Sequence, residues 1–109
     1  MIIEQNSIEK DLWAEKIHPA EKISEDIVFS NSFTQKPFIL LSLERIDMGQ
    51  FIEQSNFQKN GQRLLHSVNR IDMKAENITT EGFSIRLKTW NNNKIYGYRI
   101  SWTAISPED

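Results

Sequence analysis

The strongest constraint on the fold of this sequence is a strict alternation of apolar and polar residues in its C-terminal half. In segments 70–76 and 83–88, every second residue is apolar and its neighbours are polar or charged. This period of two indicates a β-strand with one buried face, whereas a helix would repeat every three or four residues. The apolar face carries Ile71, Met73 and Ala75 in the first segment, and Phe83, Ile85 and Leu87 in the second.

Other segments extend the pattern and indicate an all-β protein. Residues 27–33 alternate, and residues 38–47 and 95–105 are rich in strand-forming side chains. Short strands separated by turns, without a helical period, are typical of an antiparallel sandwich. We therefore expect an antiparallel β-sandwich with five strands, to which a segment near the N-terminus could add a sixth. We expect Phe83, Ile85, Leu87, Ile100 and Trp102 among its most buried side chains, and Tyr96, Tyr98, Ile100, Trp102 and Ala104 on one face of the last strand.

Two turns are expected on either side of the segment 83–90. Thr80-Glu81-Gly82 precedes it, and we expect Gly82 to adopt the positive φ that glycine takes without strain. Asn91-Asn92-Asn93 follows it and is expected to form a hairpin loop, because asparagine tolerates a left-handed backbone.

A chain of 109 residues fits one domain. Residues 1–25 are expected to form an N-terminal segment that packs on the body through Trp13, Ile17 and Ile23. Within it, IEKDLWAEKI fits either one or two helical turns or a short strand laid across the body. Residues 26–109 are expected to form the sandwich, with an insertion at 48–68. The insertion is apolar enough to be a hairpin folded onto the body or a contact surface for another chain.

Composition excludes several classes of function. The chain has no cysteine and only two histidines, which excludes disulfides, thiol catalysis and cysteine-based metal sites. A net charge of -2 argues against a sequence-independent nucleic-acid binder, and no apolar stretch is long enough to span a bilayer. Known catalytic motifs are missing and the acids lack the spacing of a calcium loop, so we expect neither an enzyme nor a cofactor.

Trp90 is the residue that most favours a binding function. It falls on the polar face of its segment beside Lys88, where an indole is costly unless something covers it. One interpretation is that Trp90 packs on a neighbouring strand or on another copy of the chain. The other is that it stacks on a sugar whose hydroxyls bind Arg70 and Asn91. Such a shallow site binds weakly and is normally repeated in an oligomer.

The C-terminal half also resembles a known family. Residues 69–105, NRIDMKAENITTEGFSIRLKTWNNNKIYGYRISWTAI, are similar to the H-type lectin domain known from snail agglutinins and discoidins. Upstream, VFSNSFTQKPFILLSLERID resembles earlier strands of that family, so the likeness covers residues 28–105 apart from the insertion. The ordered motifs that carry it are Arg70, Ile78-Thr79, Gly82-Phe83, Thr89-Trp90, Ile95-Tyr96 and Ser101-Trp102.

The resemblance implies a six-stranded antiparallel β-sandwich that assembles as a homotrimer, sometimes doubled into a hexamer. It also implies binding of glycans with terminal galactose or N-acetylgalactosamine (GalNAc). The sugar-contacting residues of the family fall on Arg70, Trp90, Asn91 and Tyr96. The acidic contact of the family falls by position on His18, and with a gap in the alignment Glu21, Glu25 or Asp26 would supply the acid.

Two functions remain open on the sequence alone. One is a non-catalytic lectin that binds galactose-type sugars multivalently through a homo-oligomer. The alternative is a trimeric structural or assembly module of a larger surface or tail protein, with the sugar site altered or lost. The copies could pair the alternating charges of segment 70–76 across an axis, or they could pack apolar surfaces. No signal peptide is visible, which fits a cytosolic protein, a mature form or an excised domain.

Overall fold

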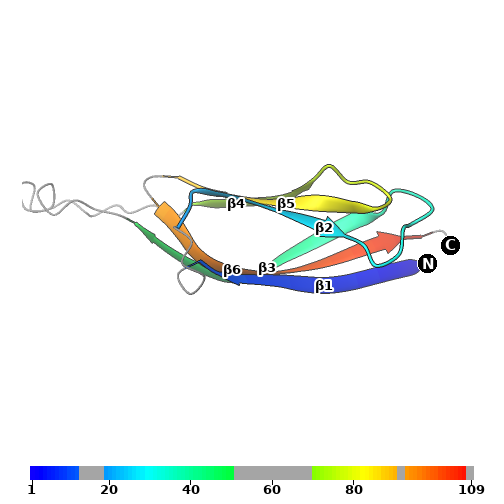
Figure 1. The fold of residues 1–109 in the computed structure, drawn as a ribbon, viewed down its shortest axis with the longest axis horizontal. Coiled ribbons are helices and arrows are strands. Elements are labelled where there is room, and N and C mark those ends of the chain that lie inside the picture. The colour runs from blue at the N-terminus through cyan, green and yellow to red at the C-terminus, as the bar shows by residue number, and fades with distance from the viewer. Residues whose placement is uncertain (13–18, 51–69, 91–92, 108–109) are drawn as a thin grey trace, which may run out of the picture.

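The protein is an antiparallel β-sandwich, described by a computed structural model for residues 1–12, 19–50, 70–90 and 93–107. Two three-stranded sheets have the orders β1-β6-β3 (the first sheet) and β2-β5-β4 (the second sheet), and they face each other as two layers (Figure 1). The predicted all-β, six-stranded antiparallel sandwich is confirmed. Within the described ranges, no helix is long and apolar enough to cross a membrane. The strands are β1 (Ile2–Asp11), β2 (Lys22–Val28), β3 (Phe38–Gln50), β4 (Ile71–Glu76), β5 (Gly82–Thr89) and β6 (Asn93–Ser106).

The hydrophobic core lies between the two central strands, β5 and β6. The five side chains predicted to be most buried are each at most 4% exposed, which confirms the predicted core faces. Phe83 of β5 and Trp102 of β6 join the sheets through an edge-to-face contact with ring centroids 5.4 Å apart. Phe29 and Phe33, in the connection after β2, close one end of this aromatic cluster at a centroid distance of 4.9 Å. Burial of these rings, together with the aliphatic side chains of the same core, holds the layers together.

The N-terminal segment supplies a complete edge strand. β1 pairs along its whole length with β6, from Ile2 opposite Ser106 to Asp11 opposite Gly97. Residues 8–11, which begin the segment left open between helix and strand, are therefore extended. β2 starts at Lys22, four residues before the expected start of the sandwich at residue 26. Trp13, Ile17 and most of the insertion at 48–68 lie outside the described residues, although residues 48–50 still belong to β3.

β6 departs from the predicted alternation at Tyr96. The pairing of β3 with β6 passes from Asp47 opposite Gly97 to Met48 opposite Ile95, so Tyr96 is the extra residue of a β-bulge. Ile95 is fully buried and Tyr96 is half-buried. The prediction that Tyr96 shares a face with the later aromatic residues of β6 is wrong, because one extra residue reverses the alternation.

The turn before β5 differs from the prediction as well. Gly82 does not have a positive φ; the positive φ among the described residues belongs to Asn77, at 52°. Thr79 organises this turn, because its hydroxyl oxygen accepts hydrogen bonds from the amides of Glu81 and Gly82. Gly82 is required for a different reason. Its backbone approaches Ile27 of β2 so closely that no Cβ atom fits between them.

Candidate functional site

The candidate site is built around Trp90, which follows the last residue of β5. Pairing of Ile71 with Thr89 places Arg70 beside Trp90, one step beyond the paired end of β4 and β5. The Cζ atom of Arg70 lies 5.7 Å from the centroid of the indole, and Nζ of Lys88 lies 4.8 Å from it. The indole is half-buried. The structure therefore brings together Arg70 and Trp90, two of the residues predicted to contact a sugar, and adds Lys88.

The backbone around Trp90 is held by hydrogen bonds that the sequence did not reveal. The carbonyl oxygen of Trp90 accepts hydrogen bonds from the backbone N of Asn93 at 3.1 Å and from its Nδ2 at 2.7 Å. Thr89 donates from its amide to the carbonyl of Glu21 at 2.9 Å and from Oγ1 to the carbonyl of Arg70 at 2.6 Å. Thr89 and Asn93 are almost fully buried, so these bonds are shielded from water. The indole is thus presented by a fixed backbone.

Tyr96 comes to this end of the molecule from the other sheet. It sits in the bulge of β6, and its carbonyl oxygen accepts a hydrogen bond from the amide of Leu12 at 2.9 Å. Its ring lies against Gly49 of β3, where a Cβ atom would be 3.2 Å from Cε2 of Tyr96. His18 and Asn91, the other two residues placed in the site by position, lie outside the described residues.

The three candidate carboxylates lie in different surroundings. Glu25 accepts a hydrogen bond from the hydroxyl of Tyr98, which is buried between the sheets, and lies 3.9 Å from Nζ of Lys10. Asp26 accepts a hydrogen bond from Oγ of Ser84 at 2.8 Å, near the opposite end of β5 from Trp90. Glu21 is attached through its backbone to Thr89, and its carboxylate pairs with Lys94 at 3.2 Å. Glu21 is therefore the candidate acid nearest to Trp90 along the sheet.

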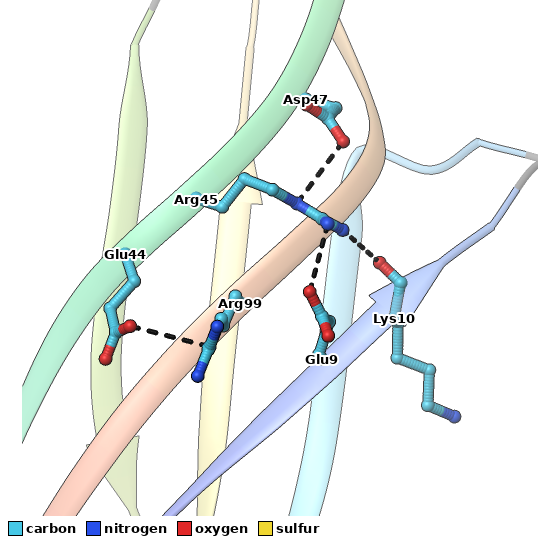
Figure 2. Close-up of polar contacts among 6 residues, drawn as sticks. All are labelled: Glu9, Lys10, Glu44, Arg45, Asp47 and Arg99. Carbon is cyan, nitrogen blue, oxygen red and sulfur yellow. Dashed lines mark hydrogen bonds and ion pairs between the residues drawn. The ribbon is translucent and has the colours of Figure 1, made fainter.

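A second polar cluster lies on the first sheet and was not predicted. The guanidinium of Arg45 contacts Oε2 of Glu9 at 3.0 Å, Oδ2 of Asp47 at 3.5 Å and the carbonyl oxygen of Lys10 at 3.2 Å (Figure 2). Arg45 thereby joins β3 to β1 across β6. Gly97 leaves room for this cluster, since a Cβ atom there would lie 2.8 Å from Oδ2 of Asp47 and 3.2 Å from Nη2 of Arg45. Only strand register could reveal this cluster, because its residues are far apart in the sequence.

The first sheet also carries exposed apolar residues at its other end. The register places Ile3, Ile105 and Phe38 in one row across β1, β6 and β3. Ile3 is 50% exposed and Phe38 is 69% exposed, and Leu40, two residues further along β3, is 59% exposed. An exposed apolar row of this kind is typical of a surface that another molecule covers.

The family of this chain is decided by its match to the H-type lectin domain, which spans residues 24–105. The chain belongs to the H-type lectin domain family. The match includes most of β2 and all of β3 to β5, together with every described residue around Trp90. It confirms the resemblance seen in the motifs of residues 28–105.

Individual relatives agree with this assignment. One of the discoidin-1 polypeptides of Dictyostelium discoideum is 29% identical over 82 residues, which cover 75% of this H-type lectin chain and 27% of that protein. A Fuscovulum blasticum protein named ATP synthase subunits region ORF 7 is 35% identical over 81 residues, covering 73% of this chain and 56% of its own length. The chain thus spans less than two thirds of the length of these curated relatives.

Solved structures show the same fold. Discoidin II of Dictyostelium discoideum superposes with a TM-score of 0.68 at 23% identity, covering 96% of this chain and 36% of that one. A tailspike of Pseudomonas phage phi297 superposes with a TM-score of 0.53 at 8% identity, covering 94% of this chain and 15% of the tailspike. At these identities the likeness is one of fold alone.

Proposed function

We propose that this H-type lectin domain binds galactose-type sugars, including GalNAc, at Trp90, and that it does so without catalysis. The observation that carries the proposal is a half-buried indole on a fixed backbone with the guanidinium of Arg70 beside it. An indole face complements the C–H groups of a sugar, and a guanidinium supplies planar donors for its oxygens. Tyr96, Asn91 and an acid from Glu21 or a neighbouring residue complete the proposed contacts.

A glycan array probed with the full chain is the direct test. Calorimetry should follow with galactose and GalNAc, using glucose and mannose as matched neutral sugars. We expect weak binding of galactose and GalNAc and weaker binding of the other two. No binding to any sugar by the folded protein would reject the proposal.

We further propose that the chain acts as a homotrimer, so that several weak sites bind one multivalent glycan together. The exposed apolar row of the first sheet supports self-association through this face. The charged strand β4 supports it less, because Glu76 already pairs with Lys74 and Arg86 of its own chain. Surface ion pairs contribute only about 0–1 kcal/mol each, whereas burial of apolar side chains contributes more. Analytical ultracentrifugation tests the number of copies, and a stable monomer would reject this proposal.

The assembly module remains the second candidate function. The fold likeness to a phage tailspike favours it, because that neighbour carries the same fold within a much longer chain. The two candidates differ in one measurement. A trimer that binds no glycan on the array favours assembly, and a trimer that binds galactose-type glycans favours the lectin.

A further inference from the structure

On the face of the second sheet that points away from the core, some of the described charged side chains have a partner of opposite charge and others do not. At one end, Oε1 of Glu76 lies 3.3 Å from Nζ of Lys74 and 3.1 Å from Nη1 of Arg86. At the other end, Arg70 and Lys88 lie over Trp90, and within the described part of the chain no carboxylate is within ion-pair distance of either. Among the described residues, the two cations beside the indole therefore form no ion pair with a carboxylate.

The pairing of β2 with β5 adds a further positive charge beside Trp90. Lys22 of β2 lies directly opposite Lys88, which adds a third cation to the same row. Asp72 lies opposite Lys88 on the other side and offsets part of this charge, although it makes no ion pair with Lys88 among the described residues. The nearest candidate acid, Glu21, is engaged with Lys94. Counted over the residues that the structure describes, the charges beside Trp90 are therefore mostly positive, although the chain as a whole has a net charge of -2.

A neutral sugar would satisfy these cations only in part, which fits the weak binding expected for galactose and GalNAc. Stacking it on Trp90 would remove water from the ammonium of Lys88 and the guanidinium of Arg70, and a buried cation without a partner is costly. A carboxylate or a sulfate ester would replace that water with charge-assisted hydrogen bonds. Guanidinium groups bind both anions in a bidentate way, and the lysine contributes a mobile positive charge.

We propose that the sugar bound at Trp90 carries an anionic substituent, a carboxylate or a sulfate ester, held by Arg70 and Lys88. This inference rests on the proposed sugar binding and narrows its ligand class to uronic acids or sulfated sugars of the galactose type. The protein supplies the cations and the ligand supplies the acid, which reverses the arrangement expected if Glu21 were to bind the hydroxyls of a neutral galactose.

Calorimetry with three sugars that differ in one group tests the inference: galactose, galacturonic acid and galactose 6-sulfate. We expect at least one charged sugar to bind about ten-fold or more tightly than galactose, because charge-assisted hydrogen bonds are stronger than neutral ones. The two charged sugars separate the carboxylate from the sulfate as the preferred group. Lys88→Gln is expected to remove most of this preference. Lys74→Gln is the matched control on the same strand pair, and it should keep the preference because Lys74 pairs with Glu76.

Each contrary outcome has a distinct meaning. Equal binding of the neutral and charged sugars would overturn the anionic ligand and leave the proposed sugar binding intact. No binding of any sugar would reject the proposed function together with this inference. Inorganic sulfate, or a single-stranded oligonucleotide, that bound as tightly as the charged sugars would assign the cations to a site for simple anions or phosphates and would also overturn it.

Discussion

Gly82 and Ile27 approach each other so closely that a Cβ atom on Gly82 would lie 2.1 Å from the carbonyl oxygen of Ile27. The two residues lie near the paired end of β2 and β5, beside the aromatic cluster of the core. The obstacle is backbone, which cannot rotate away as a side chain can. We expect Gly82→Ala to lower the free energy of unfolding by about 1–3 kcal/mol, the usual cost of overpacking. Urea unfolding followed by tryptophan fluorescence measures it.

Gly49→Ala is the matched control for this change. Its new Cβ atom would meet only the ring of Tyr96, at 3.2 Å, and that side chain can give way by a few tenths of an ångström. We expect a smaller loss of stability than at Gly82. Equal losses at the two positions would mean that glycine in a strand, and not the contact with Ile27, sets the cost.

Replacing Trp90 by Ala should weaken sugar binding. Loss of an aromatic contact at the centre of a site typically costs about 1–3 kcal/mol, which corresponds to a drop in affinity of about 5- to 150-fold. Trp90→Phe keeps an apolar ring and should retain more of the affinity. Calorimetry with the best sugar found on the array is the measurement. If Trp90→Ala bound that sugar as tightly as the unchanged chain, the site would have to lie elsewhere.

Replacing apolar residues of the exposed row by lysine should dissociate the oligomer. In the double variant Phe38→Lys and Leu40→Lys, like charges would meet wherever copies pack this face, so sedimentation should show a smaller species. Val28→Lys is the control, because Val28 is 80% exposed on the edge strand of the other sheet. A trimer that survived the double variant but dissociated when Arg70 and Glu76 were neutralised would place the charged strand at the axis instead.

Tyr98 and Glu25 should be energetically coupled. The tyrosine is 1% exposed and donates a hydrogen bond from its hydroxyl to the carboxylate of Glu25, whose side chain is 16% exposed. A hydrogen bond to a charged group contributes about 1.5–3 kcal/mol, so Tyr98→Phe should destabilise the fold by an amount in that range. In a double-mutant cycle with Glu25→Gln, the two losses should not add. Strict additivity of the two losses would show that the hydrogen bond contributes nothing.

Sugar binding should be unchanged by EDTA. In the part of the chain that the structure describes, no three acidic or histidine side chains gather where they could hold a metal ion. The main proposed contacts come from the indole of Trp90, the guanidinium of Arg70 and the ammonium of Lys88, none of which needs a bridging cation. Calorimetry before and after chelation checks this, and binding that returned only with added calcium would contradict it.

The sequence predicted the core well and the site in part. In β5 apolar and polar residues alternate without interruption, and the strands paired with it are regular as well. The buried face that carries Phe83, Ile85 and Leu87 could therefore be assigned without a structure. The alternation misled at Tyr96, because a bulge depends on how β3 pairs with β6, two strands that are far apart along the chain. Gly82 was recognised as special for the wrong reason, since a close approach to β2 cannot be seen from a turn motif alone.

The sequence by itself indicated most of the strands of the body, the face that most of them bury and the family, because these depend on local periodicity and on ordered motifs along the chain. It left β1 open between helix and strand. Only the tertiary structure decided which side chains from distant segments become neighbours. It brought Arg70 and Lys88 over Trp90 and engaged Glu25 with Tyr98 and Lys10. It also aligned Ile3, Ile105 and Phe38 into one row. These neighbours are set by the register between strands that are distant in the sequence, and a shift of one residue in that register would have turned each of these side chains to the opposite face.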